Sequence, residues 1–125
     1  MTRDEILNMP AGREMDALIA EKVMGFYFNT YGKSFTGKKY PGWHNLNQLL
    51  HYSTDIAAAL EVMEKMANKP GASWCIETHY YKDGTVMYWV IYKPYKNATF
   101  AHVYEDKSLP FAISKVALLA VMEVA

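Results

Sequence analysis

Residues 73–93 read Ser-Trp-Cys-Ile-Glu-Thr-His-Tyr-Tyr-Lys-Asp-Gly-Thr-Val-Met-Tyr-Trp-Val-Ile-Tyr-Lys, and this stretch decides the fold. Aromatic and β-branched residues, which favour strands, fill both ends of it. Between them lies Asp83-Gly84, a favoured two-residue turn. The sequence therefore predicts a β-hairpin with strands over 73–81 and 86–93.

The predicted turn also fixes which residues of the two strands oppose each other. With a two-residue loop, Tyr81 faces Val86 and Ile76 faces Ile91. Large apolar side chains then fall on both faces of the hairpin. A sheet that is apolar on both faces needs a covering layer on each, so we expect helices on both sides.

The elements around the hairpin follow from helix caps, chain breakers and apolar spacing. In chain order we expect a short helix after Thr2, a helix over 13–24 ending at Gly25, a strand over 26–31, a loop over 32–51, a helix from Ser53 or Thr54 to Ala67 with Ile56, Leu60, Met63 and Ala67 facing inward, a third strand over 99–104, and a helix over 108–122. The predicted fold class is α+β. It is a single domain over 1–125, a three-layer α/β/α sandwich whose small antiparallel sheet of three to four strands has helices on both faces.

The composition of the 125-residue chain excludes several classes of protein. Thirteen Lys and Arg balance thirteen Asp and Glu, which argues against a bulk nucleic-acid or membrane-surface binder. Cys75 is the only cysteine, so no disulfide framework forms within the chain. The polar N-terminus is not a signal peptide, and the longest apolar run is too short for a membrane span. We expect a soluble intracellular protein.

The charge is unevenly spread along the chain. Residues 1–21 carry a net charge of −3, and residues 55–125 carry −1. Residues 22–54 contain four lysines and no acid, a net charge of +4, together with eight aromatic residues. Lysines supply charge for phosphates and aromatic rings supply stacking faces, which is the combination that nucleotides require.

This basic segment leads into the predicted N-terminus of the helix that ends at Ala67, where unpaired backbone N–H groups favour an anion. The pattern predicts a pocket for an anionic, nucleotide-like small molecule. Its candidate binding residues are Lys38, Lys39, Tyr40, Trp43, His44, Tyr52, Ser53 and Thr54. Two features weigh against it: Asp55 competes with a bound anion, and the aromatic residues can simply hold a long loop against the domain.

The motifs that resemble catalytic or metal sites are incomplete. Cys75 and His79 share a strand face but stand roughly 13 Å apart, too far to form a nucleophile–base pair. The histidines show no closed ligand spacing for zinc. Gly32 to Lys38 has the spacing of a phosphate-binding loop, but Lys39 stands where Ser or Thr is required. We expect no enzymatic activity, no metal and no cofactor.

Four strings of the sequence resemble the phage ABA sandwich domain family. They are Met-Thr-Arg-Asp-Glu-Ile-Leu at 1–7, Gly-Arg-Glu-Met-Asp-Ala-Leu-Ile-Ala-Glu-Lys-Val-Met-Gly at 12–25, Tyr-Ser-Thr-Asp-Ile-Ala-Ala-Ala-Leu-Glu-Val at 52–62, and Leu-Pro-Phe-Ala-Ile at 109–113. Family members often carry Trp where this chain has Phe26 and Leu60. The resemblance implies a phage or prophage protein with helices on both sides of an antiparallel sheet. It assigns no functional residue.

Taken together, these features predict a small non-enzymatic phage accessory protein in the cytoplasm of the bacterial host. We expect it to bind the anionic ligand and so to sequester a signal of host defence. The alternative is a protein–protein interaction module that inhibits or adapts a host or phage protein. The charge-poor helix over 108–122 also leaves homo-oligomerisation open, although the same helix can simply cover the sheet.

Overall fold

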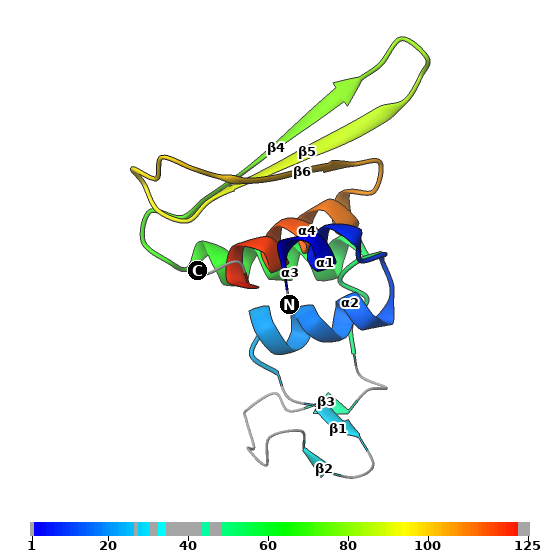
Figure 1. The fold of residues 1–125 in the computed structure, drawn as a ribbon, viewed down its shortest axis with the longest axis vertical. Helices are drawn as coiled ribbons and strands as arrows, with labels where there is room; N and C mark the ends of the chain where they lie inside the picture. The colour runs from blue at the N-terminus through cyan, green and yellow to red at the C-terminus, as the bar shows by residue number, and fades with distance from the viewer. Residues whose placement is uncertain (1, 27, 31–32, 35–43, 46–48, 123–125) are drawn as a thin grey trace.

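A computed structural model describes residues 2–26, 28–30, 33–34, 44–45 and 49–122 of the chain (Figure 1). Its elements are α1 (Arg3–Asn8), α2 (Arg13–Leu18), the π-helix η1 (Ile19–Val23), β1 (Phe28–Thr30), β2 (Lys33–Ser34), β3 (His44–Asn45), α3 (Ile56–Ala67), β4 (Ser73–Tyr80), β5 (Val86–Lys93), β6 (His102–Asp106) and α4 (Leu109–Met122). Two three-stranded sheets form, with strand orders β4-β5-β6 and β2-β1-β3. None of the described helices is long and apolar enough to cross a bilayer.

The sheet β4-β5-β6 is antiparallel throughout, as predicted, but the register of its hairpin differs from the prediction by one residue. Ile76 pairs with Val90, and Thr78 pairs with Tyr88. The cause is the turn, because the N–H of Tyr81 donates to the carbonyl of Thr85 at 2.9 Å and leaves a three-residue loop. Gly84 ends this loop at φ +88°, the left-handed conformation that such loops require.

The shifted register separates the two faces of the sheet more sharply than the prediction did. Val90 and Tyr92 point to the face that carries the helices and are buried. Trp89 and Ile91 point to the opposite face. In Figure 1 the described helices gather on one side of this sheet, and the end of the β4–β5 hairpin reaches past them.

The predicted α+β class is confirmed: a small antiparallel sheet packs against helices. The prediction placed helices on both faces of the sheet, whereas the helices within the described residues cover the face that carries Val90. The register groups Trp74 and Ile76 with Tyr92 and Val90 on that face and puts Trp89 and Ile91 on the face that the described helices leave uncovered. The third strand, β6, also begins and ends later than the predicted 99–104.

The N-terminal helices form largely as the sequence indicates. Thr2 caps α1 in a capping box with Glu5, each side chain bonding the other residue's backbone N–H. The predicted helix over 13–24 is present as α2 followed by η1, in which the N–H of Met24 reaches back five residues to the carbonyl of Ile19 at 3.0 Å. Gly25 ends it at φ +76°, as predicted.

Helix α3 presents a different face to the core than the spacing of its larger residues predicted. Ala58, Ala59, Val62 and Met66 are buried. Ile56 and Leu60, which were predicted to face inward, are 41% and 50% exposed. The buried face of α3 thus includes two small alanines, and α3 packs against α4.

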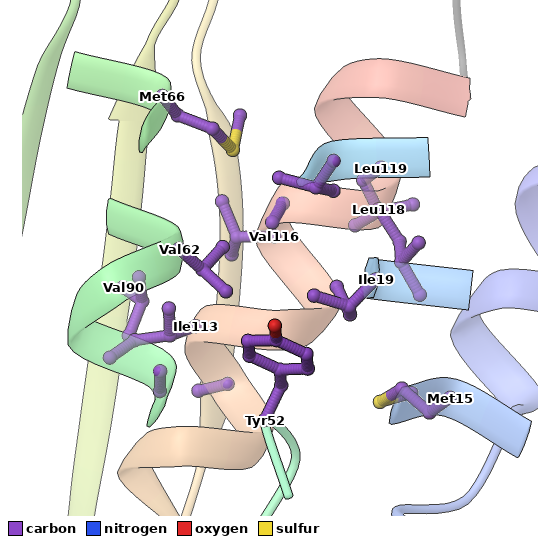
Figure 2. Close-up of a cluster of buried hydrophobic side chains, with 14 of the residues drawn as sticks. Met15, Ile19, Tyr52, Val62, Met66, Val90, Ile113, Val116, Leu118 and Leu119 are labelled. Carbon is purple, nitrogen blue, oxygen red and sulfur yellow. The ribbon is translucent and has the colours of Figure 1, made fainter. Parts of the chain in front are cut away.

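Helix α4 lies at the centre of the molecule and packs against α1, η1, α3, β5 and β6. Eight consecutive residues from Ala112 to Leu119 are buried, which confirms that this helix covers the sheet. Figure 2 shows Ile113 and Val116 of α4 beside Val62 of α3 and Val90 of β5. The hydrophobic core is therefore built around α4 rather than around the sheet alone.

One charged residue, Lys115, is completely buried in this apolar helix. Its ammonium Nζ donates hydrogen bonds to the carbonyl oxygens of Ile6, Leu7 and Met9 at 2.7, 3.1 and 2.6 Å. The same Nζ lies 4.6 Å from the ring centroid of Phe111. Burial lowers the pKa of Lys115, while Asp106 acts in the opposite direction. Lys115 thus satisfies the terminal carbonyls of α1 and ties that helix to α4.

We expect Lys115→Met to lower the free energy of unfolding by about 3 kcal/mol, because it leaves buried carbonyl groups of α1 without donors. Urea denaturation measures this loss, and hydrogen exchange should show that α1 loses protection first. Lys65→Met, at an exposed position of α3, is the matched control and should change stability by less than about 0.5 kcal/mol. Equal stability of Lys115→Met and the wild type would contradict the role given to Lys115.

Candidate functional site

The predicted ligand-binding residues divide into those that the structure describes and those that it does not. Lys38, Lys39, Tyr40 and Trp43 lie outside the described residues, and for His44 only its place in β3 is described. Three predicted residues remain, Tyr52, Ser53 and Thr54, and they directly precede α3.

Two of these three residues point inward, which changes their role. Tyr52 is 1% exposed, and its carbonyl accepts a hydrogen bond from the buried hydroxyl of Ser114 at 2.9 Å. Desolvation by burial, helped by Glu61 and Asp16, raises the pKa of Tyr52 to about 12. Ser53 is fully buried. Tyr52 and Ser53 therefore support the site from inside and are not placed to contact a ligand, whereas Thr54 is exposed.

The residue that holds this segment is Asp16 of α2, which the sequence reasoning did not single out. Its carboxylate is 1% exposed and accepts hydrogen bonds from the N–H and the hydroxyl of Ser53 at 2.8 and 2.7 Å. The Ser53 hydroxyl also accepts from the N–H of Gly12 at 3.0 Å. The sequence did contain a signal, because Asp16 stands beside the apolar stripe of the predicted helix over 13–24. A charge that is buried there requires hydrogen-bond partners.

At the surface of this network, a second pair of side chains lies above Asp16. Arg13 Nη1 lies 3.4 Å from Asp16 Oδ2 and 3.3 Å from His51 Nδ1. The His51 Nδ1 is 4.0 Å from the same carboxylate oxygen. The side chains of Arg13 and His51 are 48% and 62% exposed. Two partly exposed, nitrogen-bearing side chains thus lie beside a buried carboxylate, and one of them, His51, belongs to the acid-free segment 22–54.

The N-terminus of α3 is capped differently from the prediction. Asp55, rather than Ser53 or Thr54, is the N-cap, and its carboxylate accepts from the N–H of Ala57 at 3.2 Å. The Ser53 hydroxyl instead donates to Asp16 and accepts from the N–H of Gly12, so it bonds to α2 and the residue before it and not to the first turn of α3. The cap carboxylate occupies the end of the helix that the prediction gave to an anion, so the exposed Arg13–His51 pair is the better candidate for the anion contact.

Some residues of the motifs that resemble catalytic or metal sites lie within the described part of the chain, whereas Gly32 and residues 35–39 lie outside it. Among the described residues, no three His, Cys, Asp or Glu side chains lie close enough to hold a metal ion. Glu77 and His79 do meet, with His79 Nε2 3.2 Å from Glu77 Oε1, and both are partly exposed on β4. Cys75 is a free, exposed thiol on the same strand.

The described geometry defines a small α+β domain in which helices pack against an antiparallel sheet and a polar network joins α2 to the start of α3. The chain matches the Phage ABA sandwich domain over residues 17–118, most of its length. The protein therefore belongs to the phage ABA sandwich domain family, as the four sequence strings indicated. No curated protein and no solved structure matches the chain.

The contact between Asp16 and Ser53 can be tested by a double-mutant cycle. We expect Asp16→Ala to cost about 3 kcal/mol, because it leaves two buried donors of Ser53 unpaired, and Ser53→Ala to cost about 1–2 kcal/mol. The double variant should lose about 1–2 kcal/mol less than the sum of the two. Urea unfolding measures all three, with Glu64→Ala at an exposed position as the control. Strictly additive losses would contradict the contact.

The raised pKa of Tyr52 predicts a loss of stability in alkali. The folded protein favours the neutral phenol, so this contribution is fully present below pH 10 and is lost as the pH rises toward 12. A pKa raised from 10 to about 12 corresponds to roughly 3 kcal/mol of stability. Tyr52→Phe should remove that part of the alkaline fall in unfolding free energy, while Tyr95→Phe, at a 49% exposed position, should leave it unchanged. Identical pH profiles for wild type and Tyr52→Phe would refute the prediction.

Proposed function

We propose that this phage protein binds an anionic, nucleotide-like small molecule in the cytoplasm of the bacterial host, without catalysing a reaction, and thereby sequesters a signal of host defence. The observation that carries the proposal is the exposed Arg13–His51 pair, with nitrogens 3.3 Å apart, in which His51 belongs to the acid-free segment 22–54. Family membership supports the phage context.

The chemistry of the pair suits a phosphate group. A guanidinium presents planar N–H donors that match the oxygen atoms of a phosphate, and a histidine ring nitrogen supplies a further donor. Asp16 holds Arg13 from below, so part of the ordering cost of binding is met before the ligand arrives. In the proposed mechanism Lys38 and Lys39 add charge, Tyr40 and Trp43 add stacking surface, and Thr54 lies at the rim.

The test uses ADP, pyrophosphate and adenosine as probes. ADP and pyrophosphate should raise the melting temperature, since a ligand at 100 times its dissociation constant stabilises a protein by about 2.7 kcal/mol, and uncharged adenosine should have a much smaller effect. Native mass spectrometry of the purified protein, before and after unfolding, would show whether a small molecule already accompanies it.

Substitutions test which residues contact the ligand. The double change Lys38→Glu and Lys39→Glu should abolish ADP binding, and Arg13→Gln should weaken it at least tenfold, or about 1.4 kcal/mol. The matched control is Lys65→Glu with Lys69→Glu, two exposed lysines at the end of α3. Unchanged affinity in both test variants, or no response to either phosphorylated probe, would contradict the proposal.

A second candidate function, a protein–protein interaction module, is favoured by a different observation. Large apolar side chains are exposed near the ends of the sheet, with Tyr80 80% and Phe100 50% exposed. Aromatic residues are enriched at protein interfaces. This function predicts a specific co-purifying host or phage protein whose binding is insensitive to the lysine substitutions.

A further inference from the structure

The face of β4-β5-β6 opposite the helices carries an ordered pattern of side chains. The register brings them into two rows that cross all three strands and, at each end, a shorter row of two residues. In order along the strands these are Ser73 with Lys93, then Cys75 with Ile91 and Val103, then Glu77 with Trp89 and Glu105, and last His79 with Met87. One row is thus apolar, one holds an indole between two carboxylates, and one holds a lysine.

This face, which we call the open face, is accessible over much of its area. Cys75, Glu77 and Glu105 are exposed, and Val103 is 41% exposed. Trp89 is half-buried, and its ring stacks on His79 with centroids 5.0 Å apart. The Trp89 Nε1 is buried and, within the described residues, has no hydrogen-bond partner. A sheet that is apolar at its centre is normally covered on both sides, so the open face calls for a partner.

We propose that the open face binds the open face of a second copy of this chain, with the strands of the two copies antiparallel. The distribution of charge on the open face favours a second copy of the chain as the partner and favours antiparallel strands. The two-fold axis runs along the apolar row of Cys75, Ile91 and Val103, between the two sheets. Each residue of this row then meets its own counterpart, so Ile91 packs on Ile91 and Val103 on Val103 of the second copy. The reversal then brings Lys93 of the second copy over Trp89, between Glu77 and Glu105.

The opposed groups are complementary in this orientation. A lysine over an indole gains a cation–π contact, and carboxylates on both sides add opposite charge. With the strands of the two copies parallel, Glu77 would lie over Glu105 of the second copy and Glu105 over its Glu77. Such contacts between like charges are unfavourable. Isologous packing of one surface on itself is also the commonest way for a chain to dimerise.

The size of the open face sets the expected strength. Three strands spaced ~4.8 Å apart and seven residues of ~3.4 Å rise cover roughly 300 Å² in projection. Specific interfaces of standard size bury about 800 Å² per partner, so this dimer should be weak and concentration-dependent. We expect a dissociation constant of about 10–100 µM.

Sedimentation equilibrium and small-angle scattering of the full chain test the proposal. The wild type should pass from monomer to dimer over that concentration range. Val103→Glu should raise the dissociation constant at least tenfold, because two carboxylates would meet on the axis. The matched control is Leu60→Glu, an exposed apolar position on α3, which should dimerise like the wild type. Circular dichroism checks that both variants fold.

The orientation has its own test. Lys93→Glu should weaken the dimer, and adding Glu77→Lys to it should restore part of the affinity. A short bis-maleimide should join Cys75 to Cys75 of the second copy, because packed sheets lie ~10 Å apart, too far for a direct disulfide. Monomer at every concentration up to about 1 mM would overturn the proposal. A dimer that Val103→Glu does not weaken, or that Lys93→Glu strengthens, would overturn it equally.

Discussion

The buried ammonium of Lys115 is the interaction on which the helical layer depends. Its three carbonyl partners all belong to the end of α1 or the turn that follows, more than a hundred residues away in the chain. A helix as short as α1 is marginal by itself, and its last carbonyls need donors. Because α4 supplies that donor from its own centre, α1 is fixed to the same helix that fills the core between α3 and the sheet.

This arrangement also explains the position of the polar network at the start of α3. Asp16, Ser53 and Gly12 are joined by hydrogen bonds beneath the surface, and Ser114 of α4 holds the neighbouring carbonyl of Tyr52. The segment before α3 is therefore attached to α2 on one side and to α4 on the other. Arg13 and His51 are exposed above a fixed support, which is the condition for recognising a small ligand with few contacts.

Much of the fold was predictable because local patterns agree with the tertiary structure. The cap at Thr2, the glycine after the first long helix and the antiparallel hairpin all follow from short sequence signals. The register could not be predicted, because Asp83-Gly84 fits both a two-residue and a three-residue loop, and hydrogen bonds of Tyr81 decide between them. Which side of α3 faces the core depends on its packing against α4, and local sequence patterns do not predict that packing.

The segment before α3, which the sequence predicted to bind a ligand, holds a polar network whose partners the sequence did not indicate. The region before α3 is where the network forms, yet Ser53 is buried by a bond to Asp16, which lies 37 residues earlier in the chain. Long-range pairs of this kind cannot be read from spacing. Tyr52 and Ser53 are buried, whereas the side chains of Arg13 and His51 beside the same network are exposed.

The π-helix η1 makes this part of the chain sensitive to the insertion or deletion of a residue. A π turn holds one residue more than an α turn, and a residue added to or removed from a helix rotates everything beyond it by about 100°. The wide turn lies directly before Gly25, where the chain leaves the helices for β1. Deleting one residue there would restore a regular α-helix and redirect the whole segment that follows. In this part of the protein, a one-residue deletion should therefore change the direction in which the chain leaves the helix more than a substitution would.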